Sequence, residues 1–354
     1  MVKNNQSPLK ICHVIAGAQT GGAETFCLDM VKALHDRGVN QVMISRPYAH
    51  ILDAMAERNI PHYPMGFQRW WKWPQQNRLS SIIKKESPDL VHGWMNRASS
   101  FMPSGIKPPV LGWFGGYYDL KNYRHSNFHM GVTRDIVRHI GAATGHPDRA
   151  YLGHTFGTLA ADKPVSRADF GLPEGKPIVL LLSRMHWKKG VDLLLEAAAK
   201  LPDLAFLMAG DGPDLDTYKK QASALGLDDR VCFAGWRNDR AALLDLADIC
   251  VLPSRYEPFG TVIAEAWFAK VPLVATRADG AKQYVTHDKD GLLSDIDDLD
   301  GLVENLARLQ TDKALAKRLI KNGTKTYQDE FERETVTTRL IASYQDMISR
   351  HHAG

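Results

Sequence analysis

The sequence predicts an α/β protein built from two Rossmann-like, doubly wound domains, and three observations predict this class. A chain of 354 residues is long enough for two domains of roughly 150–200 residues each. Short apolar runs typical of buried strands alternate with segments of helical periodicity, which is the order expected of a parallel sheet with helices on both faces. A Pro- and Gly-rich region from about 162 to 177 separates two such cycles, and we interpret it as the interdomain linker.

The first cycle begins with an apolar strand over 10–15 and continues with a helix from about 23 to 35. The helix is predicted because apolar residues recur with the helical period, at Phe26, Met30, Val31 and Leu34. Further strands are predicted over 40–44, 89–92 and 110–113. This cycle defines a first domain over 1–165.

The second cycle follows the linker with the same alternation of strands and helices. Its strands are predicted over 178–182, 204–209, 231–233 and 249–252. Its helices are predicted over 191–201, 214–225 and 240–246. This cycle defines a second domain over 166–333, and a final helix from about 334 to 349 lies in a terminal segment over 334–354.

The composition is that of an ordinary globular protein, with 44% hydrophobic and 24% charged residues. The four cysteines are scattered without a Cys-x-x-Cys pair, which favours reduced thiols and a cytoplasmic location. We find no signal-peptide pattern at the first residues and no apolar run near the roughly 20 residues that a membrane span needs. The sequence contains no zinc-finger or RNA-recognition pattern, so we expect no nucleic-acid partner.

The charge is distributed unevenly along the chain. Residues 1–165 contain 19 Lys and Arg against 11 Asp and Glu, whereas residues 166–354 contain 25 against 29. This asymmetry is either chance clustering or a sign that the first half meets an anionic partner, such as a membrane face, a lipid-phosphate acceptor or a charged glycan.

The segment from Ser254 to Ala266 carries the most chemical information. It places Glu257 in a loop after the predicted strand 249–252 and Glu265 inside the next helix. The loop lies at the carboxyl end of a strand, where open α/β sheets bind ligands. Gly260 and Thr261 open the helix, so their unpaired N–H groups suit a phosphate, whereas the two oxygens of Glu265 suit a vicinal diol. Phosphate and diols together indicate a nucleotide sugar; the plainer alternative is two solvated surface carboxylates.

The same residues resemble the E-x7-E signature of retaining GT-B glycosyltransferases of the group 1 type, which includes sucrose synthase-like and phosphatidylinositol mannosyltransferase-like enzymes. The match includes Pro258 and Phe259 between the two glutamates. The resemblance implies a GT-B fold, with an acceptor-binding domain over 1–165 facing a donor-binding domain over 166–333 across a cleft. It also implies that the terminal helix in 334–354 returns to the first domain.

Other segments match donor-binding elements of this family. Ser183 to Gly190 resembles the G-R-x4-K-G element, whose two cations, here Arg184 and Lys189, would neutralise a diphosphate without a metal. The resemblance assigns catalytic roles to Arg184, Lys189 and Glu257. It also assigns donor-binding roles to Gly21 and Gly22 at the diphosphate, and to Gly210 and Gly212 in a turn near the nucleotide. Val231 is expected to lie beside the base.

Asp295-Ile-Asp297 resembles the metal-binding D-x-D of a different glycosyltransferase fold. It lies in an acidic run just before a helix, where N-capping and compensation of the helix dipole explain it better. We therefore expect no metal and no cofactor, because the nucleotide sugar is a substrate.

The acceptor side departs from the family pattern, since Gly115 occupies the position of a histidine that many relatives carry. Five residues are candidates for acceptor-side roles: His92, Tyr117, Asp119, Trp70 and Trp71. For His92 a structural role is equally open. The tryptophans belong to a segment, 67–73, with three tryptophans and two cations. It is either buried core, an interfacial anchor or a sugar-stacking platform.

The sequence thus predicts a metal-independent retaining transferase that uses a UDP-sugar first and a GDP-sugar second. We expect a glycan or lipid-linked acceptor in envelope polysaccharide or lipopolysaccharide synthesis, and a location at the inner face of the membrane. A glycosidase is disfavoured because its two carboxylates would face one bond about 5–9.5 Å apart. A GT-B nucleotide-sugar epimerase and a non-catalytic nucleotide-sugar-binding scaffold remain as alternatives, the latter because of Gly115.

Overall fold

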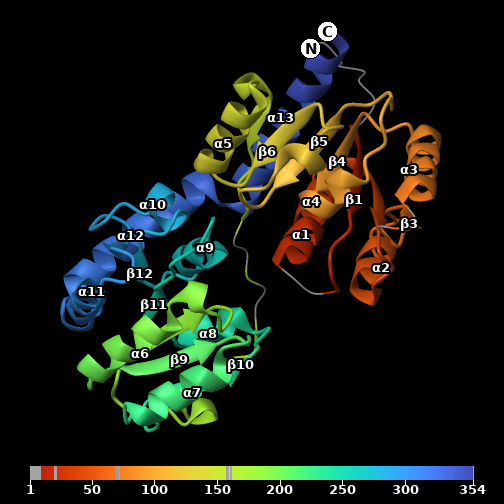
Figure 1. The fold of residues 1–354 in the computed structure, drawn as a ribbon. Helices are drawn as coiled ribbons and strands as arrows, with labels where there is room; N and C mark the ends of the chain where they lie inside the picture. Colours follow the sequence, from red (N-terminus) through yellow and green to blue (C-terminus); the bar gives the residue numbers. More distant parts are fainter. Residues whose placement is uncertain are drawn as a thin grey trace. The chain divides into compact units, whose positions relative to one another are not determined.

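A computed structural model describes residues 9–19, 22–68, 70, 72–156, 159 and 162–353. The chain forms two compact units (Figure 1). The N-terminal unit comprises Met1–Thr155 together with Arg333–Gly354, and the C-terminal unit comprises Phe156–Glu332. The acceptor- and donor-binding roles expected of the domains over 1–165 and 166–333 stay predictions.

The N-terminal unit contains a seven-stranded parallel sheet in the order β3-β2-β1-β4-β5-β6-β7. Its strands are β1 (Lys10–Ile15), β2 (Asn40–Ser45), β3 (His62–Pro64), β4 (Leu90–Trp94), β5 (Val110–Phe114), β6 (Phe128–Gly131) and β7 (Ala150–Leu152). Its helices are α1 (Gly22–Asp36), α2 (Ala49–Ala56), α3 (Lys72–Glu86), α4 (Met95–Ser100), α5 (Arg134–Thr144) and α13 (Arg333–Ala353). The last helix of the chain therefore packs with the first unit, as the family resemblance implied.

The C-terminal unit contains a six-stranded parallel sheet in the order β10-β9-β8-β11-β12-β13. Its strands are β8 (Ile178–Leu182), β9 (Ala205–Ala209), β10 (Val231–Gly235), β11 (Ile249–Leu252), β12 (Leu273–Thr276) and β13 (Leu292–Ser294). Its helices are α6 (Val191–Lys200), α7 (Leu215–Ala224), α8 (Arg240–Leu246), α9 (Thr261–Phe268), α10 (Ala281–Tyr284), α11 (Leu299–Thr311) and α12 (Lys313–Glu330).

Both sheets are covered by helices, so their central strands are buried along their whole length. Every residue of β8, β9 and β11 is buried, and so is every residue of β4 and β5. This burial on both faces explains why β8, β9 and β11 are continuous apolar runs rather than alternating patterns. All strands within each sheet point the same way, so their carboxyl ends meet at one edge, where the loops of the candidate site lie.

The expected fold class is confirmed, and the predicted elements match the observed ones closely. The predicted strands over 10–15, 178–182 and 249–252 have the observed bounds. The helix predicted to start near 334 runs from Arg333 to Ala353, so it is longer than the expected end at 349. Among the described residues, no helix has both the length and the apolar character needed to cross a membrane.

Candidate functional site

The candidate site is built from loops at the carboxyl edge of the sheet in the C-terminal unit. The loop after β8 carries Arg184 and Lys189, and the loop after β11 carries Glu257. These two strands are neighbours in the sheet, so the loops that follow them are neighbours too. The topology therefore brings together residues that are 68 positions apart in the sequence.

Lys189 and Glu257 form an ion pair at the centre of this edge. The Lys189 Nζ donates to Oε2 of Glu257 at 2.6 Å, and both side chains are mostly shielded from solvent. Gly190 permits the close approach of the two loops, because a Cβ at this position would lie 2.0 Å from the carbonyl oxygen of Pro253. Its φ of +65° also favours glycine. The pair thus links the two predicted motifs directly.

Arg255 fixes the same two loops in place, although the sequence reasoning did not select it. Its guanidinium donates to both carboxylate oxygens of Asp192, at 2.8 and 2.7 Å, and to the carbonyl of Trp187 at 2.8 Å. Its Nε donates to Asp297 at 2.6 Å. Burial alone would raise the pKa of Asp192, but the hydrogen bonds and charge of Arg255 outweigh burial and lower that pKa.

Glu265 lies in a different environment from Glu257. It is buried inside α9, and its Oε1 accepts from Arg240 at 2.8 Å. Among the described residues its Oε2 has no hydrogen-bond partner. Burial raises the pKa of Glu265, whereas the charge and hydrogen bond of Arg240 act in the opposite direction. A buried carboxylate oxygen without a partner is costly to the fold, and it is the kind of acceptor that a ligand hydroxyl satisfies.

Gly260 begins the helix that carries Glu265. Its φ of +83° lies in the left-handed region, and it occupies the N-cap of α9 without a capping side chain. Thr261, the first residue of the helix, is exposed, so the first N–H groups of α9 are at the site edge. Pro258 is partly buried, and Phe259 packs its ring against those of Tyr284 and Phe331.

Two further glycines bring the turn after β9 against the loop after β8. A Cβ at Gly210 would lie 1.8 Å from the carbonyl oxygen of Ser183, and one at Gly212 would lie 2.2 Å from that of Met185. Only glycine allows these contacts, so close packing between the two loops explains why both positions of the turn are glycine. Arg184, in the same loop, is exposed at the site edge.

Exposed aromatic rings surround this edge. Trp187 and Trp236 belong to the loops after β8 and β10, and Tyr256 belongs to the loop after β11. The Nζ of Lys188 lies 5.0 Å from the centre of the Tyr256 ring, so Lys188 has a contact of its own, separate from the ion pair of Lys189.

Val231 is not brought together with the other donor residues. It is the first residue of β10, at the amino end of this strand, and it packs against the core of the unit. It also lines a cavity of about 390 Å³ at that opposite edge of the sheet. Gly22 begins α1 in the N-terminal unit, and Gly21 lies outside the described residues.

The acidic run before α11 caps the helix and forms ion pairs, and the capping was predicted from the sequence. Asp298 caps the helix by accepting from the N–H of Gly301 at 3.0 Å, and Asp297 is bound to Arg255. Asp295 pairs with Arg277 at 3.2 Å. Over the described part of the chain, no group of three or more His, Cys, Asp or Glu is placed to hold a metal ion.

Comparison with known protein families identifies the family to which this chain belongs. Residues 162–326 match the model of glycosyl transferases group 1, and residues 20–144 match the model of glycosyltransferase family 4. The lipopolysaccharide core biosynthesis glycosyltransferase LpsD of Rhizobium meliloti is 30% identical over 349 residues, which cover 97% of this chain and 98% of LpsD. The chain belongs to the group 1 glycosyl transferase family.

Other relatives of this glycosyltransferase agree in sequence and in fold. LpsE of Rhizobium meliloti, also named a lipopolysaccharide core biosynthesis glycosyltransferase, is 30% identical over 342 residues, or 95% of this chain and 99% of LpsE. A glycosyltransferase from Rickettsia africae has a TM-score of 0.85 at 21% identity, with 97% and 99% of the two chains covered. Alr3699/HepE of Anabaena, in complex with UDP-glucose, has a TM-score of 0.80 at 20% identity, with 96% and 100% covered. The fold is thus GT-B.

His92 lies in the core of the glycosyltransferase's N-terminal unit. It is fully buried in β4, its Nδ1 is hydrogen-bonded to the hydroxyl of Tyr344 at 2.7 Å, and its ring stacks on Trp94. Burial, and secondarily the charge of His13, lowers the pKa of His92 well below its ordinary value. A side chain without exposed surface contacts no acceptor in this conformation, which favours the structural role that the sequence left open.

The other acceptor-side candidates of the glycosyltransferase are spread over its N-terminal unit. The Tyr117 hydroxyl donates to Asp135 at 3.3 Å, and Asp119 is exposed, caps the turn Leu120–Asn122 and pairs with Lys121. Trp70 is exposed, and Trp71 lies outside the described residues.

The departure at Gly115 has a local packing explanation. A Cβ there would lie 2.8 Å from Cε of Met95 and 3.0 Å from its Sδ, so Met95 fills the space that a larger side chain would need. Met95 itself has a φ of +64°, unusual for a residue with a side chain. Met95 therefore occupies the space beside Gly115, the position at which the family resemblance implied a histidine.

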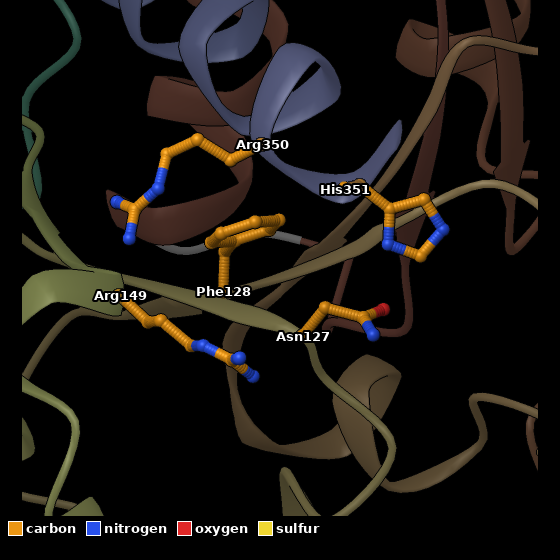
Figure 2. Close-up of a pocket in the computed structure, with 5 residues that line it drawn as sticks. All are labelled: Asn127, Phe128, Arg149, Arg350 and His351. Atoms are coloured by element: carbon orange, nitrogen blue, oxygen red, sulfur yellow. The ribbon is translucent and has the colours of Figure 1, made fainter. Parts of the chain in front are cut away.

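The N-terminal unit of the glycosyltransferase also contains a cavity of about 250 Å³, shown in Figure 2. It is lined by Asn127, Phe128, Arg149, Arg350 and His351. Asn127 and Arg149 precede β6 and β7, so the cavity lies at the amino ends of these strands, away from the carboxyl edge. Arg350 is bound there to Asp148 and to the hydroxyl of Tyr151. The cavity contains none of the residues selected from the sequence.

Proposed function

We propose that this glycosyltransferase moves a sugar from a nucleotide-sugar donor to a glycan or lipid-linked acceptor in the synthesis of lipopolysaccharide or another envelope polysaccharide. The similarity to LpsD and LpsE, both lipopolysaccharide core biosynthesis glycosyltransferases, supports the lipopolysaccharide assignment. The complex of Alr3699/HepE with UDP-glucose supports a UDP-sugar as the first choice of donor, with a GDP-sugar second.

One observation carries the proposal. At the same sheet edge, the ion pair of Lys189 with Glu257 lies beside α9, which holds a buried Glu265 with an unpartnered oxygen. Glu265 is proposed to accept from the ribose hydroxyls, and the N–H groups at Gly260 and Thr261 are proposed to bind the diphosphate. This is a donor site within one unit.

The proposed reaction retains the configuration of the anomeric carbon. The bond from that carbon to the leaving phosphate oxygen breaks, the bond to the acceptor oxygen forms, and the acceptor proton passes to the phosphate oxygen. Arg184 and Lys189 stabilise the departing diphosphate with fixed positive charge, so the step is proposed to need no metal. Glu257 orients both Lys189 and the sugar hydroxyls.

We further propose that the reaction takes place at the inner face of the membrane, where a lipid-linked acceptor would lie, with the protein in the cytoplasm and bound peripherally. The excess of Lys and Arg in residues 1–165 supports this part of the proposal, because cytoplasmic leaflets are anionic.

Thermal denaturation with added nucleotides tests the donor site. UDP, GDP, ADP and CMP, and their common sugar conjugates, are added separately with and without EDTA. At 100 times its dissociation constant the correct nucleotide adds about 2.7 kcal/mol of stability, which is a measurable rise in Tm. We expect UDP to raise the Tm equally in both conditions.

The Arg184→Gln/Lys189→Gln variant serves as the test of the site, and Lys220→Gln, on the exposed side of α7, as its control. The double variant is expected to lose the response to UDP, whereas the control keeps it. If no nucleotide raises the Tm of the wild type, the donor-site proposal fails and a non-catalytic scaffold becomes the better interpretation.

A further inference from the structure

Two tryptophans of the N-terminal unit are strongly exposed. Trp70 exposes 81% of its surface and Trp73 exposes 72%, the highest values among the exposed large hydrophobic residues that the structure describes. The interpretation of segment 67–73 as buried core is therefore wrong for both residues, although Phe67 is buried. Exposed tryptophans that lie close together indicate a surface that meets a partner.

Trp73 continues into a basic helix face. Helix α3 (Lys72–Glu86) packs Leu79, Ile82 and Ile83 into the core and leaves a stripe of exposed residues on its outer face: Trp73, Pro74, Asn77, Arg78, Ser81, Lys84 and Lys85. From Trp73 to Lys84 the stripe is about 17 Å long at the helical rise per residue. Figure 1 shows α3 at the periphery of its unit, beside β3.

This surface has no balancing acidic charge in its own sequence. Residues 58–85 contain six Lys and Arg and no Asp or Glu. Glu86, which ends α3, is engaged elsewhere, because it binds Lys10 and the hydroxyl of Tyr63. Lys85 lies over the ring of Tyr63, 5.3 Å from its centre, and is close enough to Glu86 to interact with its charge. Arg78 and Lys84 have no acidic residue in their own segment, so they give the outer face of α3 its positive charge.

A second group of cations lies beside the start of α3. The Nε of Arg124 donates to Nε2 of His125 at 3.0 Å, and burial together with the charges of Arg124 and Lys72 lowers the pKa of His125. Burial and the charge of Arg124 likewise lower the pKa of Lys72. The positive charges of Lys72 and Arg124 thus repel one another, and an anionic partner would relieve this repulsion.

We propose that Trp70, the outer face of α3 and the group of Lys72, Arg124 and His125 form the surface by which this chain docks on an anionic phospholipid bilayer. Tryptophan rings suit the boundary between headgroups and acyl chains, and lysine and arginine suit anionic headgroups. Each such cation near an anionic bilayer strengthens binding about fivefold. The inference deepens the proposed function, since it rests on an acceptor that is held at a membrane.

Sedimentation of the full chain with vesicles tests the surface. The vesicles are phosphatidylcholine alone or phosphatidylcholine mixed with an equal amount of phosphatidylglycerol. Wild type is expected to bind the mixed vesicles, more weakly as salt rises, and not the neutral ones. Trp70→Ala/Trp73→Ala and Arg78→Gln/Lys84→Gln are each expected to weaken this binding by about tenfold or more.

A control variant removes the same charge elsewhere. Lys317→Gln/Lys321→Gln changes two exposed lysines on α12 of the C-terminal unit and is expected to bind the mixed vesicles like wild type. All four proteins are expected to keep the Tm and its rise with UDP. If the variants of the surface bind as tightly as wild type, or if wild type binds no anionic vesicle at low salt, the surface proposal is overturned. An intact response to UDP in that case leaves the proposed donor site standing.

Discussion

The two units share a parallel, helix-covered sheet, but they place their polar residues differently. In the C-terminal unit the motif residues follow the strands: Lys189 and Glu257 stand in loops after β8 and β11, where ion pairs hold them. In the N-terminal unit His92 is the third residue of β4 and points into the core. The difference teaches that position relative to the end of a strand, more than residue type, separates a site residue from a packing residue.

The units also differ in how they balance charge. In the C-terminal unit the motif residues Lys189, Glu257 and Glu265 are all engaged in ion pairs. Arg255 of the same loops pairs with Asp192 and Asp297. The exposed face of α3 in the N-terminal unit carries positive charge without such partners in its own segment. Paired charges keep a site rigid in the absence of ligand, whereas unpaired surface charges can bind an oppositely charged partner. Three variants test whether these differences between the units are real.

The largest effect is expected at the ion pair of the C-terminal unit. Glu257→Ala removes the partner of Lys189 and the acceptor proposed for the sugar hydroxyls, so turnover should fall by at least about tenfold. The fold should persist, because Glu257 lies in a loop, outside the buried strands and helices of the core. Steady-state kinetics with the donor identified by thermal denaturation measures the change.

Glu196→Ala is the matched control for this substitution, since Glu196 is an exposed residue of α6 in the same unit. It should leave turnover within about twofold of wild type, as most surface substitutions do. Turnover near the wild-type level in Glu257→Ala would remove Glu257 from the site and break the contrast between the units.

An intermediate effect is expected from Glu265→Gln, which keeps the shape of the side chain and removes its charge. The affinity for the nucleotide should weaken by about tenfold, because bonds to a charged acceptor are stronger than bonds to a neutral one. Stability should stay equal or rise at neutral pH. Since burial holds the pKa of Glu265 above its unfolded value, ionisation of this group opposes folding, and the opposition disappears as pH falls through the folded pKa.

Calorimetric titration of UDP and chemical denaturation measure the two quantities in the same protein preparation. Weaker binding with undiminished stability would mean that Glu265 is retained for the ligand. A loss of stability with unchanged binding would instead make the contact of Glu265 with Arg240 a structural one.

Sequence reasoning predicted the fold well because the buried strands are continuous apolar runs and the glycines mark the turns. Motif context also predicted correctly that Lys189 and Glu257 follow strands and that Glu265 lies inside a helix, while the roles of these residues stay predictions. It missed Arg255 and Arg240, because their partners, Asp192 and Glu265, are far away in the sequence. The spacing of residues within one segment cannot predict ion pairs that form only because the sheet brings distant segments together.

The acceptor side was harder to predict for a related reason. A histidine near a strand end has the same local pattern whether its ring faces solvent or the core. The decisive contact of His92 is with Tyr344, a residue of the last helix that lies 252 positions later in the sequence. The exposure of Trp73 likewise depends on which face of α3 the core takes, and its neighbours Leu79 and Ile82 decide that face.

The smallest effect is expected in the core of the N-terminal unit. The variant His92→Phe/Tyr344→Phe removes both partners of one buried hydrogen bond, so stability near neutral pH should change by only about 1 kcal/mol. Turnover should stay unchanged. The informative quantity is the dependence of stability on pH, which reports the buried histidines directly.

Burial lowers the pKa of His13 to about 4, and it lowers the pKa of His92 well below its ordinary value. Between these values and about pH 6.5 the unfolded chain binds protons that the folded chain does not, so stability is lost as pH falls. Wild type should lose about 1 kcal/mol for each such histidine on going from about pH 7.5 to 5.5, and the double variant should lose correspondingly less. Urea denaturation at both pH values measures this difference. An unchanged pH dependence together with a fall in turnover would place His92 at the acceptor after all, and the contrast between the two units would then lie in their charge alone.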